Sequence, residues 1–246
     1  MSNGWTEHVR HEHVRYAGSV TPRTRQPVSR RERPAKPALS RAGIVEAALG
    51  VLRAEGLEKV TMRRLAQELD TGPASLYVYV ASTAELHAAV LDELLGEVEL
   101  GRRGDDWAEA LIAVLVSYTD VLFAHPALAG SAVSARPSGR NYLRLLEKLL
   151  ALLGEGGVPD EQAAWGVDLL LLAATAVAAE HSAPAGTEDW DATRQAVENA
   201  PAETHPRVRA LAGPLLSGSA EERLTWHFRT LINGIRHTPV PKGEPL

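Results

Sequence analysis

The spacing of apolar residues predicts a helix that begins just after Leu39. Ser40 is a good helix-capping residue, and apolar positions follow it with the 3.6-residue period of an α-helix. Gly56 ends the pattern. The inward face of this helix is predicted to carry Ile44, Ala47, Ala48, Val51 and Leu52.

Two shorter helices are predicted next, separated by a tight turn. The first runs over Thr61–Leu69 and is capped by its first residue. Residues 70–72 form the turn, and the next helix, Pro73–Tyr79, starts with a proline, whose missing N–H costs nothing at that position. Its inward side chains are Leu76 and Val80, and its outward ones are Ala74, Ser75, Tyr77, Val78 and Tyr79.

The rest of the chain also shows helical patterns, with prolines at or near the breaks between them. A connecting helix is predicted to extend from Leu86 to about Leu100, and a charged loop follows it at 101–106. No strand pattern competes, so we predict an all-α fold. The later helices are expected at Trp107–Ala124, Gly139–Leu153, Pro159–Ser182, Trp190–Asn199, Pro206–Leu216 and Ala220–Arg236.

Composition supports an all-α protein of the cytoplasm. The 246 residues include 38 Ala and 33 Leu, which suit helices best. Cys is absent, so there can be no disulfide, cysteine nucleophile or thiolate metal site. The longest apolar stretch, Leu169–Ala179, has 11 residues, whereas a membrane span needs about 20. Residues 1–20 contain no apolar run typical of a secretory signal. We therefore expect no membrane contact and a cytoplasmic location.

Charge divides the chain near residue 38. Residues 1–38 hold eight Lys or Arg and three Asp or Glu, a balance of +5, whereas residues 39–246 have a balance of −10. Prolines and a shortage of large apolar residues predict that 1–38 is a disordered basic arm, which either solubilises the protein or lies along DNA phosphates. A second disordered tail is expected at 238–246. The histidines near the N-terminus have no fixed geometry for a metal.

The helices between residues 39 and 86 are typical of a helix-turn-helix domain. Two short helices around a Gly-containing turn, braced by a preceding helix, allow the second helix to enter the major groove of DNA. Arg63 and Arg64 can reach the DNA backbone or a guanine, while Ser75, Tyr77 and Tyr79 can bind phosphates or base edges. Such helix pairs also occur in proteins that never meet DNA, so periodicity alone leaves a structural role open.

The same segment resembles the DNA-binding domain of the tetracycline-repressor (TetR) family of bacterial regulators. The resemblance lies in A-A-L at 47–49, E-G-L at 55–57, T-M-R-R-L-A at 61–66 and P-A-S-L-Y at 73–77. It implies a helix-turn-helix domain at 39–86 and a helical ligand-binding and dimerisation domain at 87–237. Carried over by position, the family's DNA contacts fall on Thr61, Arg63, Pro73, Ala74, Ser75, Tyr77 and Tyr79.

One position departs from the family pattern. The family usually has a Lys just before the fourth helix, where it anchors a phosphate, and this chain has Thr83. Thr83 is predicted to cap that helix at the DNA surface, with Glu85 in its first turn. Because residues 39–86 hold five basic and six acidic residues, the domain attracts DNA weakly, and we expect the basic arm to replace the missing contact.

Two helices are candidates for a subunit interface. Leu169–Ala179 is apolar on every side, and the last helix carries a stripe of large apolar residues. These segments form either an intramolecular core or, as the family resemblance implies, a four-helix bundle between two copies through residues 159–182 and 220–236. The stripe on the last helix is Leu224, Phe228, Leu231, Ile232 and Ile235.

The second domain is also expected to bind a small molecule. Large or polar residues interrupt its Ala- and Leu-rich helices, although each one alone is more often a core or surface residue. The candidate ligand contacts are Trp107, Tyr118, His125, Tyr142, Trp165 and Glu180.

A part of this domain is similar to the tetracycline repressor subgroup, in which a His and a Glu hold a magnesium–tetracycline complex. The similar stretches are Arg136–Leu153 and the helix that bears Glu180, which falls at the Glu position. The His position falls at Ala132 or Val133, and a lone carboxylate is a poor case for that metal site. We therefore expect no metal and no cofactor.

The sequence favours a regulator over two other classes of protein. It contains no nucleophile elbow, P-loop, dinucleotide-binding or zinc-protease motif, so an enzyme is not expected. A helical small-molecule-binding or scaffold protein without sequence-specific DNA binding is the alternative. The favoured function is a homodimeric repressor that binds a palindromic operator and is released by a small hydrophobic effector.

Overall fold

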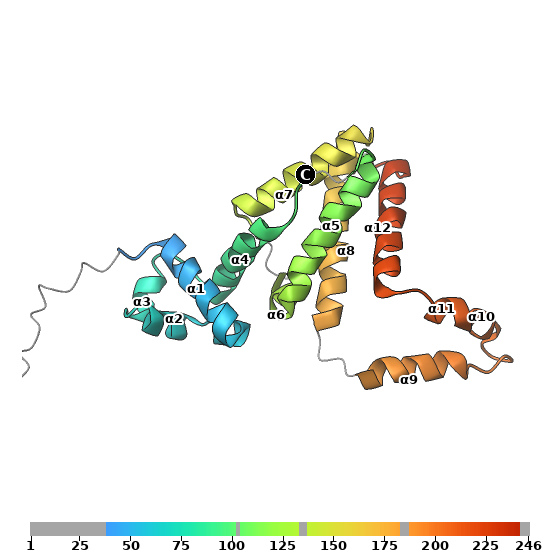
Figure 1. Ribbon diagram of the computed structural model, residues 1–246, viewed down its shortest axis with the longest axis horizontal. Coiled ribbons are helices and arrows are strands. Elements are labelled where there is room, and N and C mark those ends of the chain that lie inside the picture. The colour runs from blue at the N-terminus through green and yellow to red at the C-terminus, as the bar shows by residue number, and fades with distance from the viewer. Residues whose placement is uncertain (1–37, 102–103, 133–136, 183–186, 242–246) are drawn as a thin grey trace, which may run out of the picture. The chain divides into compact units, whose positions relative to one another are not determined.

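The computed structural model in Figure 1 describes residues 38–101, 104–132, 137–182 and 187–241. The predicted arm, apart from Ala38, and the last five residues of the predicted tail lie outside them. No strand occurs in these ranges, and the all-α prediction is confirmed. The α-helices are α1 (Arg41–Glu55), α2 (Met62–Glu68), α3 (Pro73–Leu76), α4 (Thr83–Leu94), α5 (Trp107–Ala124), α6 (Pro126–Ala132), α7 (Arg140–Glu155), α8 (Asp160–Ser182), α9 (Thr187–Glu198), α10 (Pro206–Ala210), α11 (Ala212–Leu216) and α12 (Ala220–His237).

Two predicted helix starts are confirmed by their hydrogen bonds. The Ser40 side chain accepts a hydrogen bond from the backbone N–H of Gly43 at 3.1 Å, and Thr61 accepts one from Arg64 at 3.2 Å. Each bond satisfies a backbone donor that the first turn of a helix leaves without a partner. Gly56 follows α1 with φ 86°, a conformation that side chains other than glycine adopt at a cost.

Several element boundaries differ from the prediction. The third helix has only four residues and ends at Leu76, and the connecting helix begins at Thr83 and changes to a 3-10 turn at Leu95–Glu97 instead of continuing to Leu100. The helix predicted at 206–216 is divided at Leu211, because Pro214 lacks the N–H that would bond to the carbonyl of the fourth preceding residue. Helix α6 was not predicted.

The helix-turn-helix domain packs around one small core. Ile44 and Ala48 of α1, Leu65 of α2 and Leu76 of α3 are fully buried together with Val80, which follows α3. Burial of these apolar side chains holds the three helices against one another. Helix α4 closes the domain through Leu86 and continues into the second domain.

The second domain is built on α5 and α8. Figure 1 shows these two helices side by side with α12, and they also contact α6 and α7. Gly166 of α8 permits the close approach of α12, because a Cβ atom there would lie 2.6 Å from a methyl carbon of Ile235. Gln162 of α8 donates a hydrogen bond to the Ile235 carbonyl at 2.8 Å. Both contacts fix the register of the two helices.

Two helices of this domain, Trp107–Ala124 and the segment Asp160–Glu180 of α8, are long and apolar enough to cross a membrane by length and composition alone. The expectation from the longest apolar run missed this, because polar residues divide both helices into short apolar runs while the mean hydropathy of each helix stays high. The two helices pack against each other in the core, and core helices of soluble proteins meet the same criterion. They are therefore weak evidence for a membrane.

Candidate functional site

The outward face of α3 and the turn after it presents aromatic and apolar side chains to solvent. Tyr77 is 52% exposed, Val78 is 79% exposed and Tyr79 is 39% exposed, whereas Leu76 and Val80 on either side are completely buried. The two buried residues anchor the segment, and the exposed ones are not needed for the core. An exposed tyrosine pair in the turn that directly follows a short helix has the geometry to contact a DNA groove.

The residue that caps α4 differs from the prediction. Ser82, in an extended conformation, accepts a hydrogen bond from the backbone N–H of Glu85 at 3.1 Å, and Thr83 is the first helical residue. The Glu85 carboxylate in turn accepts a hydrogen bond from the N–H of Ala81 at 2.7 Å. The prediction that Thr83 caps this helix is wrong, because the chain enters helical geometry one residue earlier than that assignment requires.

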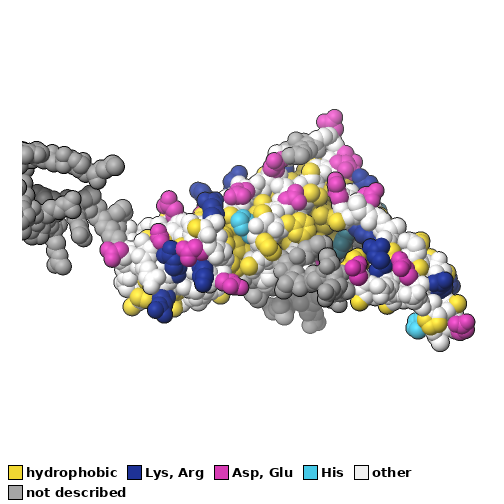
Figure 2. Space-filling model, turned by 60° about the horizontal axis from the view of Figure 1, so that its bottom comes forward, with side chains coloured by type: hydrophobic (Ala, Val, Ile, Leu, Met, Phe, Trp, Pro, Cys, Tyr) yellow, Lys and Arg dark blue, Asp and Glu magenta, His cyan; other side chains and the backbone are white. Residues whose placement is uncertain are grey.

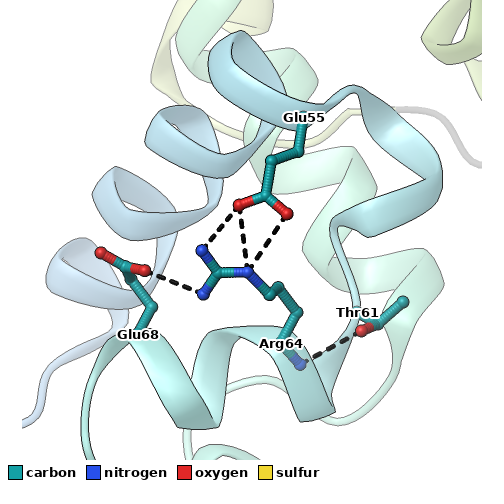
Figure 3. Close-up of polar contacts among 4 residues, drawn as sticks. All are labelled: Glu55, Thr61, Arg64 and Glu68. Carbon is teal, nitrogen blue, oxygen red and sulfur yellow. Dashed lines mark hydrogen bonds and ion pairs between the residues drawn. The ribbon is translucent and has the colours of Figure 1, made fainter.

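Arg64 joins two helices through an ion-pair cluster (Figure 3). Its guanidinium lies 2.6 Å from a carboxylate oxygen of Glu55, at the end of α1, and 2.8 Å from one of Glu68 on α2. The Arg64 side chain is only 29% exposed. The structure therefore points this arginine at α1, whereas Arg63 has no acidic partner within ion-pair distance among the described residues.

The ion pair changes the acid–base behaviour of both partners. The Arg64 guanidinium, through its hydrogen bond, holds the pKa of Glu55 below its usual range, and Glu55 and Glu68 raise the pKa of Arg64. A carboxylate with a lowered pKa in the folded state stabilises that state only while it is ionised. The contribution is complete above a pH of about 4.3, the usual pKa of an unfolded Glu, and is lost as the pH falls through the lowered value.

We expect Glu55→Gln to destabilise the protein at neutral pH and to have a smaller effect in acid. The amide keeps the shape of the side chain but loses the charge that pairs with Arg64. Thermal unfolding of wild type and variant between pH 7 and pH 3 measures the difference, with Glu46→Gln on the same helix as the control. If the difference in unfolding temperature between wild type and Glu55→Gln stayed constant below pH 4, this account would be contradicted.

A second candidate site lies inside the C-terminal domain. A pocket of about 40 Å³ opens between α5, α6, α7 and α8. The Tyr118 hydroxyl and the Thr175 hydroxyl are 2.8 Å apart, and Thr175 also donates to the Leu171 carbonyl at 2.7 Å. The pocket therefore combines an apolar wall with a few placed polar groups. Its lining residues are Tyr118, Ala132, Pro137, Tyr142, Asp168, Leu171, Leu172 and Thr175.

The structure brings together two of the six predicted ligand residues, Tyr118 and Tyr142. The other four do not line this pocket. Trp107 packs on Gly156, where an added Cβ would lie 2.4 Å from the indole ring, and His125 ends α5, as predicted from the proline that follows it. Trp165 is 63% exposed on α8. Glu180 is also exposed near the end of that helix.

Sequence reasoning missed Thr175 and Asp168, and for Thr175 a signal was available. Thr175 is the only polar residue within the apolar run Leu169–Ala179, and a polar residue placed there needs a partner. Within the part of the chain that the structure describes, no group of three His, Asp or Glu side chains is arranged to hold a metal ion. The positions compared with the tetracycline-binding His include Val133, which lies outside the described residues.

These features define a helix-turn-helix protein with a separate helical domain that contains a pocket. Family models agree with both halves: "Bacterial regulatory proteins, tetR family" matches residues 44–90, and "Tetracyclin repressor-like, C-terminal domain" matches residues 100–238. The chain belongs to the TetR family, whose members are ligand-responsive transcriptional regulators.

Two solved structures and one curated protein illustrate the relationship. The crystal structure of SCO7704 of Streptomyces coelicolor is 60% identical, with a TM-score of 0.75 over 85% of this chain and 100% of that one. ActR of Streptomyces coelicolor, in complex with actinorhodin, is 38% identical, with a TM-score of 0.70 over 81% of this chain and 96% of that one. The transcriptional repressor DrrR1 of Streptomyces coeruleorubidus is 36% identical over 52% of this chain. The match spans only about half of the curated relatives' length, including 48% of DrrR1.

Proposed function

We propose that the protein represses transcription as a homodimer that binds a palindromic operator in the cytoplasm and releases it when a small molecule enters the C-terminal pocket. The observation that carries the proposal is the exposed pair Tyr77 and Tyr79, held between the buried anchors Leu76 and Val80 within a TetR-type domain. A two-fold dimer presents two such helices to the two halves of an inverted repeat.

The DNA contacts are proposed for the residues at the exposed edge of the domain. Arg63 supplies a charge to the DNA, and Arg64 is a positioning residue that holds α2 against α1 through Glu55, while Glu68 of α2 orients its guanidinium. The remaining contacts are proposed for Thr61, Pro73, Ala74, Ser75, Tyr77, Tyr79 and Thr83, the last next to the capping serine.

Arg63→Gln and Arg64→Gln are expected to weaken DNA binding in different ways. Loss of Arg63 removes a phosphate or base contact, so the slope of log K against log salt falls by about one unit. Loss of Arg64 lowers affinity through a looser helix arrangement and leaves that slope unchanged. Titrations of a labelled duplex at several salt concentrations measure both slopes. Equal slopes for the two variants would refute the different roles.

The proposed subunit interface is the exposed apolar side of α8 together with α12. Trp165, Leu169 and Leu172 recur along α8 with helical spacing and are 43–63% exposed, and Trp226 of α12 is 70% exposed. Figure 2 shows hydrophobic side chains gathered over the middle of one face, whereas Lys, Arg, Asp and Glu mix at its ends. Helices α9, α10 and α11 join α8 to α12 and contain no buried residue within 190–216, so a second copy would also shelter their apolar side chains.

Trp226→Ala is expected to weaken dimerisation at least tenfold, because large aromatic residues contribute most to interfaces. Sedimentation across a range of concentrations measures the dissociation constant, with Arg236→Ala, an exposed residue of the same helix, as the control. A dissociation constant equal to that of wild type would place the interface elsewhere.

The proposed effector has an apolar body with a few polar groups, matching the walls of the pocket. Drug-sized ligands occupy pockets of roughly 300–1,000 Å³, so the pocket of about 40 Å³ must expand on binding. The relative ActR is solved in complex with actinorhodin, which makes actinorhodin the first compound to screen. Quenching of tryptophan fluorescence detects binding, and Tyr118→Phe with Thr175→Val tests whether the hydroxyls contribute.

The basic arm is proposed to supply the charge that the helix-turn-helix domain lacks. Deletion of residues 1–34 should lower DNA affinity and reduce the salt slope. No change in either would leave the arm as a solubilising segment.

The experiment that tests the proposed function is selection of duplexes from a random library with the full-length protein at physiological salt. Enrichment of one inverted repeat supports it. Weak, salt-driven binding without a preferred sequence would favour the alternative, a helical small-molecule-binding or scaffold protein.

A further inference from the structure

Helix α7 starts without a capping side chain of its own. Its N-cap residue is Gly139, and no side chain of the local sequence accepts a hydrogen bond from the first turn. A helix end inside a protein leaves backbone N–H groups that need acceptors. In this protein the acceptor comes from another helix.

Asp92 of α4 supplies that acceptor. One oxygen of its carboxylate accepts a hydrogen bond from the N–H of Tyr142 at 2.9 Å, and the other accepts a longer one from Asn141 at 3.4 Å. The Asn141 side chain returns a bond of 2.9 Å to the backbone carbonyl of Asp92. Both Asp92 and Asn141 are buried. Two helices far apart in sequence are therefore joined by three hydrogen bonds.

The contact is also sterically specific. A Cβ atom at Gly139 would lie 2.0 Å from a carboxylate oxygen of Asp92, so only glycine lets the carboxylate reach the helix end. The negative charge lies at the positive end of the α7 dipole, which further stabilises it there. No basic side chain forms an ion pair with Asp92 among the described residues.

The contact between Asp92 and the start of α7 connects the pocket with the helix-turn-helix domain. Tyr142, whose N–H binds Asp92, also lines the pocket of the C-terminal domain. On the other side, Asp92 lies five residues after His87 on α4, and the His87 imidazole lies 3.2 Å from the Val60 carbonyl, just before α2. About 7.5 Å of continuous helix separates the two contacts, at 1.5 Å per residue.

We propose that the Asp92 carboxylate is the positioning group through which occupation of the pocket acts on the helix-turn-helix domain. Displacement of Tyr142 by a ligand moves the first turn of α7, and the hydrogen bonds to Asp92 transfer that movement to α4. This inference rests on the proposed function, since it concerns the regulation of the same pocket. Asp92 does not line the pocket and acts on it through the backbone of Tyr142.

The test uses a substitution as a permanent occupant of the pocket, so it needs no known ligand. Ala132 is buried and lines the pocket, and Ala132→Leu fills it beyond its present size, with Ala132→Val as the milder variant if the first fails to fold. Asp92→Asn removes the charge and turns an N–H₂ group toward one of the two backbone donors. The matched control is Asp106→Asn, because Asp106 caps α5 within its own helix through a 2.8 Å bond from Ala108.

DNA affinity is measured for the full-length variants on the selected duplex. Ala132→Leu is expected to weaken binding about tenfold in the wild-type and Asp106→Asn backgrounds, within the usual range of coupling between sites. In the Asp92→Asn background the same substitution should change affinity less than threefold. A tenfold effect in folded Asp92→Asn, or no effect in wild type, would overturn the inference.

A second readout does not depend on DNA. The chain has no cysteine, so Ala42→Cys on α1 and Ala151→Cys on α7, both exposed, carry the only two spin labels in each chain. Ala132→Leu is expected to shift the distance between the labels by about 2 Å, and Asp92→Asn to abolish the shift. If no duplex is selected but this shift occurs and requires Asp92, the proposed function fails and the inference stands. If Ala132→Leu shifts the label distance in Asp92→Asn as much as in wild type, the inference is refuted and the proposed function is not affected.

Discussion

Replacing Leu76 with alanine is expected to lower the free energy of unfolding of the helix-turn-helix domain by about 2–5 kcal/mol and to remove sequence-specific DNA binding. Leu76 is completely buried, and α3 has only four residues, with a glycine N-cap that makes no side-chain hydrogen bond. So short a helix cannot hold its own conformation in water. The apolar contact of Leu76 therefore positions the tyrosines that we propose read DNA.

Val78→Ala is the matched control for stability. It removes apolar atoms two residues further on, from a side chain that is 79% exposed, so the free energy of unfolding should change by less than about 0.5 kcal/mol. Urea denaturation followed by circular dichroism compares the two variants. Equal losses for Leu76→Ala and Val78→Ala would show that α3 is not held by its core contact.

Most basic side chains of the helix-turn-helix domain are paired with acidic ones, so DNA binding depends strongly on how α2 and α3 are packed. Arg64 pairs with Glu55 and Glu68. Arg41 lies 3.6 Å from Glu85 on α4, and Arg53 lies 3.8 Å from Glu97 just after α4. Most basic side chains of the domain thus face acidic ones within the protein. Binding to DNA must therefore depend on the accurate placement of the few contact groups that remain. A change in α2 or α3 that displaces them is expected to lower DNA affinity strongly.

The sequence allowed prediction of those features that depend on neighbouring residues. Helix α5 begins and ends at the predicted residues, Trp107 and Ala124, because a charged loop precedes it and Pro126 follows it. Two capping side chains were also predicted correctly. The third cap, Ser82, was missed because the next residue, Thr83, has the same capping chemistry and only the backbone conformation distinguishes them.

Features that depend on tertiary contacts could not be predicted in this way. Trp107 was expected to contact a ligand, yet it packs on Gly156, nearly fifty residues away. Asp92 looks like an ordinary surface acid in an amphipathic helix, and its role appears only when the start of α7 lies beside it. Local periodicity shows which side of a helix is apolar but not which distant helix end its polar groups meet.

Phe228→Ala is expected to have the largest effect on stability in the C-terminal domain, about 3–5 kcal/mol. Phe228 is completely buried on α12, which packs against both α5 and α8. Removing the ring leaves a cavity where the three helices meet, and the close contact of Gly166 with Ile235 limits how far α12 can move to fill it. Urea denaturation at a fixed protein concentration measures the loss.

The control is Arg229→Ala, which alters the next residue of the same helix. Arg229 forms an exposed ion pair with Glu109 at 2.6 Å, and exposed pairs contribute about 0–1 kcal/mol. If the loss of stability came from weaker dimerisation alone, the denaturation midpoint of Phe228→Ala would return to the wild-type value at high protein concentration. A cavity within one subunit instead lowers the midpoint at every concentration, since no second copy can replace the contacts of a buried ring.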